Sequence, residues 1–334
     1  MPVWAFFVSS PETLDLEQLS GHNINRRNRE RRNGCMENRT NDRGSVLMLV
    51  SSMLIFGTIG VFRRYIPVSS AFLACFRGIL GGLCILAFSR LRKRKGAALP
   101  RRTLLGLIVS GALIGVNWIL LFEAYNQTTV AVATLCYYMQ PTIVILLSPL
   151  IFRERLTVRK SVCAAVAIAG MVLVSGVIGD SSARGGGFSG ILPGLGAALF
   201  YSAVVIMNKK LRGIDAYQKT TVQLLSAGFI MVPYLLLTGG FAGEKLTLSA
   251  LLLLLVVGIL HTGVAYVLYF GSMDGLRAQS VALLSYIDPV SALLFSAFLL
   301  REPLSLLNIL GAIMIIGSAV VSEIRGRGPG QPAA

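Results

Sequence analysis

The sequence has little charge for its length, few histidines and no motif for binding a nucleotide. Charged residues make up only 14% of the 334 residues and apolar residues 54%, whereas soluble domains carry about 25% charged residues. The length alone would allow two soluble domains. The apolar residues exclude them, because they come in blocks long enough to span a bilayer rather than in amphipathic stripes.

Metal-binding and redox motifs are also missing. The chain has two histidines and five cysteines. The cysteines in apolar blocks (Cys75, Cys84, Cys136 and Cys163) have neither CxxC spacing nor the spacing of metal ligands. The glycine-rich stretch at 185–190 lacks the Lys-Ser/Thr ending of a phosphate-binding loop, so we interpret it as part of a flexible linker over 179–189. We expect no cofactor, no metal site and no disulfide framework.

Basic residues outnumber acidic ones, with 31 Lys and Arg against 15 Asp and Glu. A nucleic-acid partner is not expected, because the basic residues form short clusters between apolar blocks, where membrane orientation demands them. With the N-terminus inside, 25 of the 31 fall in inner segments and 5 in outer loops. The sequence therefore predicts a multi-pass protein of the cell (plasma or inner) membrane with both termini cytoplasmic.

Ten apolar segments follow from residue 46 onward, each about the length that a ~30 Å hydrocarbon core requires. Lipid offers no partner to an unpaired backbone group, so these segments must be helices. The predicted fold class is an all-α integral membrane protein with ten transmembrane helices. They are expected at 46–65, 68–89, 103–124, 129–151, 158–178, 190–208, 219–238, 247–270, 279–300 and 304–323.

Both ends of the chain are polar and are expected to be disordered. Residues 1–45 are rich in Asn and Arg and cannot bury a core. Met36 stands shortly before the first apolar segment, so our hypothesis is that translation starts there and that residues 1–35 are not translated. Mass spectrometry of the intact native protein tests this. Residues 324–334 form the second polar tail.

The second half of the chain repeats the first. The segment "TLCYYMQPTIVILLSPLIFRERL" aligns with "ALLSYIDPVSALLFSAFLLREPL" at a constant offset of 148. This offset matches Tyr138 with Tyr286 and Pro141 with Pro289. Leucine-rich helices often look alike by chance, but chance does not preserve a Tyr-x-x-Pro motif together with an Arg-Glu pair twelve and thirteen residues beyond its proline. The repeat is therefore genuine.

The two copies are assigned to residues 46–178 and 190–323, with five helices in each. An odd number of helices inverts the second copy in the membrane, so Arg153-Glu154 and Arg301-Glu302 are expected on opposite sides. Inverted repeats build two alternative gates around one site near the midplane.

The paired Tyr-x-x-Pro and Arg-Glu segments resemble the EamA-type repeats of the drug/metabolite transporter superfamily, over essentially residues 46–323. The resemblance implies ten helices, cytoplasmic termini, a central cavity between the halves, and exchange or export of amino acids or related metabolites. It identifies the fold well and the substrate poorly.

Polar side chains in the middle of a span are costly and by default mark a transport pathway. Those found are Arg77, Asn117, Gln140, His261 and Asp288. Gln140 and Asp288 directly precede the matched prolines, whose missing backbone donors favour a local break in each helix. We expect the segments 138–141 and 286–289 to face each other across the substrate site.

Asp288 is the sharpest candidate, because a buried carboxylate can bind and release a proton. Proton coupling, binding of a substrate amine and a structural ion pair with Arg77 remain open as its role. Arg77 is assigned to gating or packing, with Gln223 as its rough counterpart in the second copy. His261 is assigned to coupling or gating, with a simple interhelical hydrogen bond as the alternative.

Aromatic side chains well inside the spans are expected to line the cavity, because interfacial anchoring explains only those at span ends. With the polar groups, they give the predicted substrate site: Asn117, Trp118, Tyr138, Gln140, Tyr266, Tyr286 and Asp288. The Arg-Glu pairs are expected to fix helix joints rather than to bind substrate. The GxxxG pair at Gly111–Gly115 is expected only to pack helices.

Taken with the repeat, these residues predict a secondary transporter, an exporter or exchanger of small metabolites, rather than an enzyme. One alternative is a membrane-embedded enzyme on lipid-linked substrates, which would need acids, bases or metal ligands clustered near one membrane face. Another is a non-transporting membrane subunit or sensor. The expected partners are a small-molecule substrate and the lipid bilayer, and a homodimer is left open.

Overall fold

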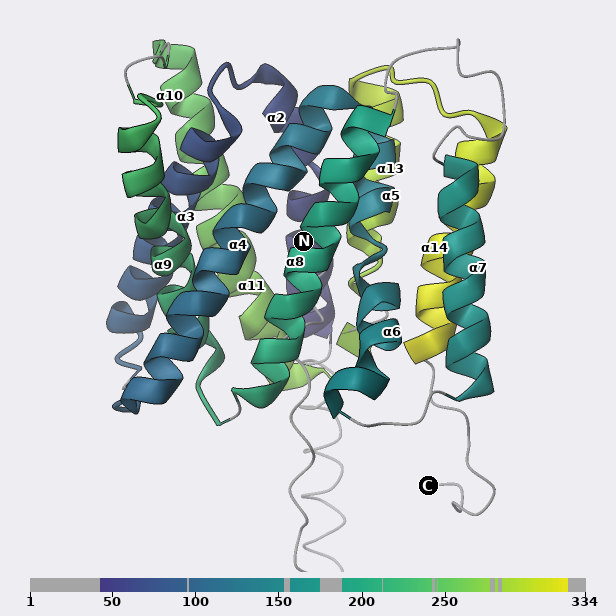
Figure 1. Cartoon of the computed structure of the whole chain (residues 1–334). Helices are drawn as coiled ribbons and strands as arrows, with labels where there is room; N and C mark the ends of the chain where they lie inside the picture. The colour runs from purple at the N-terminus through teal and green to yellow at the C-terminus, as the bar shows by residue number, and fades with distance from the viewer. Residues whose placement is uncertain are drawn as a thin grey trace, which may run out of the picture.

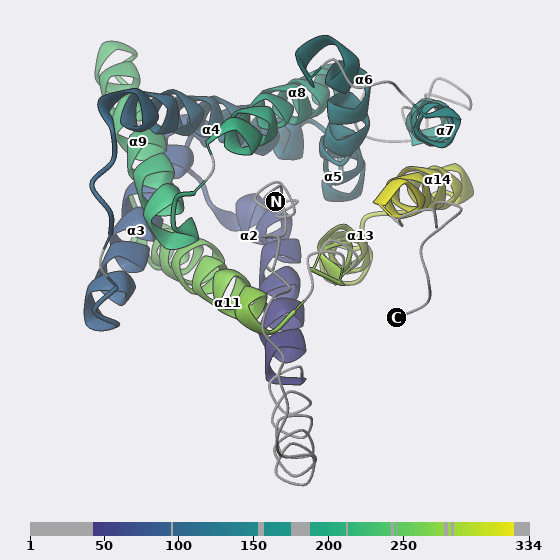
Figure 2. The same ribbon diagram turned by 90° about the horizontal axis from the view of Figure 1, so that it is seen from below.

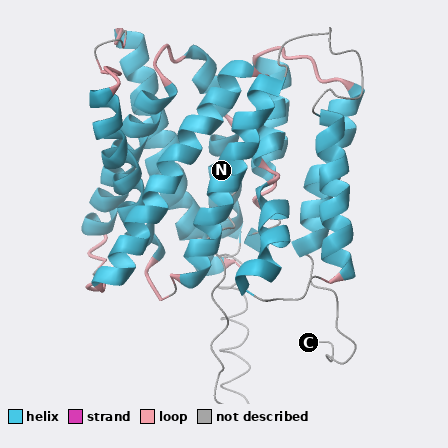
Figure 3. Cartoon of the chain, in the orientation of Figure 1, coloured by secondary structure: helices cyan, strands magenta, loops and turns pink. Residues whose placement is uncertain are grey.

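The computed structural model describes residues 43–94, 96–152, 157–174, 188–211, 213–241, 244, 246–276, 280, 281 and 284–323. All regular secondary structure in these parts of the chain is helical (Figure 3). The first helix begins at Arg43, three residues before the predicted start. The remainder of the predicted N-terminal tail, most of the predicted linker and the C-terminal tail lie outside the described residues.

The helices follow one another along the chain with short joints (Figure 1). In the first copy they are the helix at 43–57, α2 (Ile59–Tyr65), α3 (Ser70–Leu91), α4 (Arg101–Gln127), α5 (Val130–Tyr137), α6 (Gln140–Phe152) and α7 (Val158–Val174). In the second copy they are α8 (Phe188–Lys210), α9 (Ala216–Leu237), α10 (Leu248–Leu255), the π-helix η2 (Val256–Val264), α11 (Ala265–Ser272), the 3-10 turn η3 (Met273–Gly275), α13 (Ile287–Leu299) and α14 (Leu306–Glu323).

Seven helical stretches are long and apolar enough to cross a membrane, and two shorter apolar helices follow them. The long stretches are Arg43–Tyr65, Ser70–Leu91, Arg101–Gln127, Val130–Ile151, Ser189–Lys210, Ala216–Leu237 and Leu248–Ser272, and the shorter ones are Ile287–Leu299 and Leu306–Ser322. The chain is therefore an all-helical, multi-pass membrane protein in its described residues. The number of ten spans stays a prediction, because α7 and α13 have only 17 and 13 residues there.

Two of the predicted spans are interrupted at the matched prolines. α5 ends at Tyr137 and α6 begins at Gln140, so Pro141 is the second residue of a new helix. In the second copy α13 begins at Ile287, and Pro289 lies in its first turn. A proline at a helix start costs little, since its missing N–H would have no partner inside the helix there. The predicted local breaks are present.

Glycines let the central helices approach closely. A Cβ on Gly78 of α3 would lie 2.7 Å from the backbone nitrogen of Gly228 in α9, so the two backbones touch where these helices cross. Gly115 of α4 makes a similar approach to α9, where a Cβ would lie 3.1 Å from the carbonyl oxygen of Ala227. The predicted packing role of the GxxxG pair is confirmed.

The helices α7 and α14 form a pair at the side of the bundle remote from α9, as the two perpendicular views show (Figure 1 and Figure 2). Gly170 and Gly311 meet at their interface, since a Cβ on Gly170 would lie 2.9 Å from the carbonyl oxygen of Gly311. These two helices occupy the last position in each copy.

Helices at matching positions of the two copies end at opposite ends of the bundle. In the view of Figure 1, α6 ends at the lower end, whereas α13 ends at the upper end, where a short loop leads into α14. The end that holds the loop between α13 and α14 is called the Glu302 end below. The matching Arg153-Glu154 pair lies outside the described residues.

Candidate functional site

A small polar cavity lies where the interrupted helices of the two copies meet. Its volume of about 10 Å³ holds about one water molecule, so the site is closed to larger molecules in this conformation. The lining comes from the helix at 43–57, α2, α3, α4, α5 and the turn after it, and α13. The lining residues are Phe56, Gly57, Ile59, Arg77, Leu121, Tyr125, Thr134, Tyr137, Tyr138, Asp288 and Ala292.

A hydrogen bond between the copies crosses this cavity. The Tyr138 hydroxyl donates to the Asp288 Oδ2 at 2.7 Å, and both side chains are buried. The break after α5 places Tyr138 in a turn, and the break before α13 places Asp288 in a first helical turn. A carboxylate there is stabilised by the positive end of the helix dipole. The two interrupted segments therefore face each other, as predicted, while their binding of a substrate stays a prediction.

Arg77 brings a buried cation into the same cavity. Its side chain is 1% exposed, its Nε donates to the Thr262 hydroxyl at 2.7 Å, and its guanidinium lies 4.2 Å from the ring centre of Trp118. Its Nη2 has no hydrogen-bond partner among the described residues. The aromatic face of the fully buried Trp118 thus stabilises the charge. Arg77 and Asp288 give the cavity one basic and one acidic group.

His261 lies outside the cavity and connects neighbouring helices. Its Nε2 is 2.8 Å from the Thr58 hydroxyl and its Nδ1 3.4 Å from the Val256 carbonyl oxygen. The ring packs edge-on against Phe62 with centres 4.6 Å apart. It belongs to the π-helix η2, a rare geometry that often marks a functional position. These contacts favour the interhelical hydrogen bond over a proton relay.

Five other predicted site residues do not line this cavity, and one of them is Trp118, which lies behind Arg77. Asn117 links α4 to α8, with its Nδ2 donating to the Ala197 carbonyl at 2.6 Å. Tyr266 stacks on Phe270 with ring centres 5.8 Å apart. Gln140 and Tyr286 stand next to the helix breaks in the sequence and are buried, but neither lines the cavity. Both polar atoms of the Gln140 side chain lack a hydrogen-bond partner in the described part of the chain.

Several lining residues were not predicted from the sequence. Tyr125 is the clearest case, because α4 continues to Gln127 and so buries a tyrosine that lies just beyond the expected span. Its hydroxyl is 3.4 Å from that of Thr134 in α5. Tyr137 is fully buried beside Tyr138, and its position next to the Tyr-x-x-Pro motif was the one available signal.

Metal chemistry finds no support in the described residues. They contain no group of three His, Cys, Asp or Glu side chains that could hold a metal ion. Cys75, Cys84, Cys136 and Cys163 are free thiols. The polar groups that line the cavity are the Asp288 carboxyl, the Arg77 guanidinium and the hydroxyls of Thr134 and three tyrosines.

Two of the three similar proteins that follow are named as uncharacterized transporters. The uncharacterized transporter YxxF of Bacillus subtilis is 28% identical over 85% of this chain and 91% of its own length. An uncharacterized transporter of Archaeoglobus fulgidus is 28% identical over 82% and 94%, and Protein PecM of Dickeya dadantii is 26% identical over 80% and 87%. A crystal structure with 21% identity shares the fold, with a TM-score of 0.58 over 83% of this chain and 96% of that one.

The model of the EamA-like transporter family matches this chain twice, over residues 43–176 and 188–323. These matches cover most of the chain and coincide with two successive copies of one helical unit. The interrupted helices and the closed polar cavity between the copies lie within the matched residues. The chain belongs to the EamA-like transporter family.

Proposed function

We propose that this membrane transporter is a secondary transporter of small amphipathic metabolites, such as amino acids or related compounds. The observation that carries the proposal is the Tyr138–Asp288 hydrogen bond between the two copies, in a closed cavity that also holds Arg77. A site with one basic group, one acidic group and aromatic walls suits a small molecule that has both charged and apolar parts.

Alternating access around this cavity is the proposed mechanism. The opposite placement of the ends of α6 and α13 supports an inverted arrangement of the copies (Figure 1), which provides one gate toward each side of the membrane. The excess of Lys and Arg in alternate joints supports cytoplasmic termini. In the cell membrane this transporter acts as an exporter or exchanger.

Asp288 has the central role in the proposed cycle. Its carboxylate exchanges the Tyr138 hydroxyl for a proton or for an amine of the substrate, which loosens the contact between the copies. Arg77 is held by Thr262 and Trp118, so it keeps a positive charge beside the exchange site. Substrate arrival and the opening of the copies are linked in this way through one hydrogen bond.

An enzyme on lipid-linked substrates is the second candidate function, and the site supports it less. The cavity has one carboxyl group, and its space is too small for a lipid-linked group in this conformation. A non-transporting subunit is the third. Stoichiometric binding of a partner by a purified sample that moves no solute would favour it.

Untargeted metabolite profiling of cells with and without overexpression tests the proposed function. We expect at least one small metabolite to change, and proteoliposomes with the purified protein to move that compound. An Asp288→Asn variant reconstituted at equal density is the matched control and should move little. A compound that changes in cells but crosses proteoliposomes equally well with either variant contradicts the proposal.

Cysteine labelling tests the inverted arrangement independently of the substrate. Cysteines placed at Arg153 and at Arg301 should react with a membrane-impermeant reagent from opposite sides. Labelling of both from the same side would contradict the inverted repeat and with it the two-gate mechanism.

A further inference from the structure

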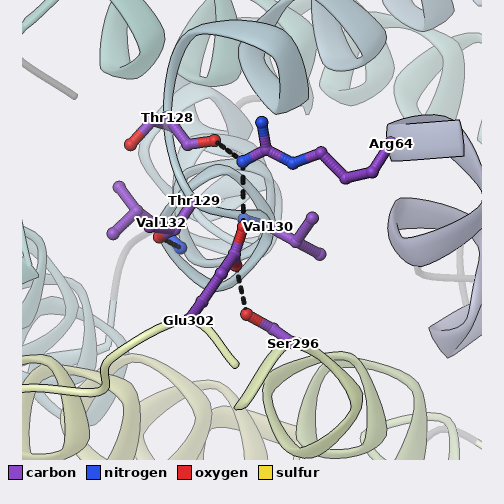
Figure 4. A network of polar contacts seen from close by, with 7 residues as sticks. All are labelled: Arg64, Thr128, Thr129, Val130, Val132, Ser296 and Glu302. Carbon is purple, nitrogen blue, oxygen red and sulfur yellow. Dashed lines mark hydrogen bonds and ion pairs between the residues drawn. The ribbon is translucent and has the colours of Figure 1, made fainter. Parts of the chain in front are cut away.

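One carboxylate gathers three partners at the Glu302 end of the bundle (Figure 4). The Arg64 guanidinium donates to Glu302 Oε1 at 2.9 Å. The backbone N–H of Val130 donates to Glu302 Oε2 at 2.8 Å, and the Ser296 hydroxyl donates to the same oxygen. Arg64 Nη2 also donates to the Thr128 carbonyl at 2.6 Å.

The local backbone aims Glu302 at these partners. α13 ends at Leu299, and Arg301 adopts a left-handed φ of 54°, which is unfavourable for a residue with a side chain. The chain therefore turns back, and the Glu302 N–H donates to the Ser296 carbonyl at 3.2 Å. This turn directs the carboxylate across the end of α13 to the start of α5.

The first turn of α5 is prepared to receive a carboxylate. The Thr129 side chain caps this helix by accepting from the N–H of Val132 at 3.2 Å. The N–H of Val130 has no partner inside the helix, as for every first helical residue. Glu302 fills that place, and its negative charge suits the positive end of the helix.

These contacts join the two copies to each other. Glu302 and Ser296 belong to the second copy, whereas Arg64 and Val130 belong to the first. The helices involved, α5 and α13, are also the helices whose inner ends lead to the Tyr138–Asp288 hydrogen bond. One pair of helices is thus held together twice, at the cavity and at the Glu302 end. Separation of α5 and α13 at this end would have to break the contacts of Glu302.

The neighbouring arginine has different contacts. Arg63 donates to the Ile66 carbonyl at 2.8 Å and to the Ser70 hydroxyl at 3.4 Å, so it stays within the first copy. The side chains of Arg64 and Glu302 are 32% and 12% exposed, so water reaches part of this contact and screens the ion pair more than it would a fully buried one. One arginine therefore holds the end of α2 in place, and the next one makes a releasable contact.

We propose that Glu302, with Arg64 and the first turn of α5, forms the gate that closes the cavity at the Glu302 end. This inference rests on the proposed transport function. It gives Glu302 of the Arg-Glu pair a role beyond the predicted one of fixing the joint between its own two helices. Each cycle breaks the Arg64–Glu302 and Val130–Glu302 contacts and remakes them.

The labelling rate of a cysteine in the cavity tests this gate without a known substrate. Ala292 lines the cavity one turn beyond Asp288, so an Ala292→Cys variant reports access to it. The background has the five native cysteines replaced by serine, and the same background without Cys at 292 is the blank. The purified protein is held in lipid nanodiscs and treated with a water-soluble maleimide.

We expect Arg64→Ala and Glu302→Gln each to raise the labelling rate about tenfold, within the usual range for coupled equilibria. The matched control is Glu123→Gln, which lies near this end and accepts from Gln127 at 2.7 Å and from the Ser70 hydroxyl at 3.2 Å, both within the first copy. It should leave the rate unchanged. Melting temperatures of all variants identify any that fail to fold, and Ser296→Ala then serves as a milder second variant.

The possible outcomes separate this gate from the proposed function. Equal rates in Glu302→Gln, Ser296→Ala and Glu123→Gln overturn the gate, even if proteoliposome flux persists. Faster labelling in the gate variants supports the gate. If the gate variants label faster while the native protein moves no metabolite, the gate is supported and the proposed transport function is contradicted.

Discussion

The two copies differ at two positions in the middle of predicted spans, where a charged side chain is costly. In its second predicted span the first copy has Arg77, and the rough counterpart in the second copy is Gln223. At the position before the matched proline, the first copy has Gln140 where the second has Asp288. Each copy therefore supplies one charge, and each charged residue has a neutral amide as its counterpart.

The charged members of both pairs line the cavity, and the neutral members do not. Gln223 instead donates to the Ser110 hydroxyl at 2.6 Å and to Asn208 Oδ1 at 2.9 Å, which ties α9 to α4 and α8. The duplicated helices thus surround the cavity, and its two charged groups stand at positions where the copies differ, Arg77 and Asp288. Of the two amides, Gln223 has such a structural role, whereas the Gln140 amide lacks a partner among the described residues.

Replacing Asp288 removes the difference at the proline position and should have the largest effect. Asp288→Asn keeps the shape but cannot bind a proton at this position, so we expect proteoliposome flux of the identified metabolite to fall about 100-fold, which corresponds to about 2.7 kcal/mol. Any dependence of the flux on pH that this carboxylate causes should also disappear. Native flux and native pH dependence in Asp288→Asn would show that the charge difference between the copies has no role in transport.

Arg77→Lys tests the other charged position with the charge retained. A lysine lacks the planar fork that stacks on Trp118 and reaches Thr262, so we expect about tenfold lower flux, for a loss of about 1.4 kcal/mol. The matched variant Gln223→Ala should lower the melting temperature but keep the flux per folded molecule. If Gln223→Ala reduces flux as much as Arg77→Lys, the two positions are not functionally different.

Tyr138→Phe separates the hydrogen bond between the copies from the packing of the ring. A hydrogen bond of this kind contributes about 1 kcal/mol, so the melting temperature should fall by a few degrees. The control is Tyr137→Phe, whose hydroxyl makes only a long 3.5 Å bond to Asn117 and should matter less. Equal losses in the two variants would mean that the bond to Asp288 contributes no special stability.

Gln140→Met should have the smallest effect of the four. The Gln140 amide lacks a protein partner within the described residues, and replacing such a group by an apolar one of similar size is nearly neutral or stabilising, by up to about 1 kcal/mol. Thermal unfolding measures it. A marked loss of stability would show that the amide has a partner after all and that the neutral copy also contributes to the site.

The sequence predicts those parts of the site that depend on local chemistry. Proline removes a backbone donor wherever it stands, so the breaks at Pro141 and Pro289 and the approach of Tyr138 to Asp288 could be anticipated. The position of Trp118 under Arg77 could not, because it depends on how α3 and α4 rotate against each other. The contact between Arg64 and Glu302 joins residues far apart in sequence, and only the folded chain brings them together.

The π-helix η2 changes the direction in which the side chains after it point, relative to the matching side chains of α4. Its i→i+5 bonds turn the chain by less per residue than α-helical bonds do, and the matching stretch of α4 is a regular α-helix. Residues beyond it that match in sequence therefore point in different directions. Trp118 stacks on Arg77, whereas its repeat equivalent Tyr266 stacks on Phe270. Unusual winding in one segment therefore adds to the differences in sequence beyond it, such as Trp118 against Tyr266, in giving matching positions of the two copies different neighbours.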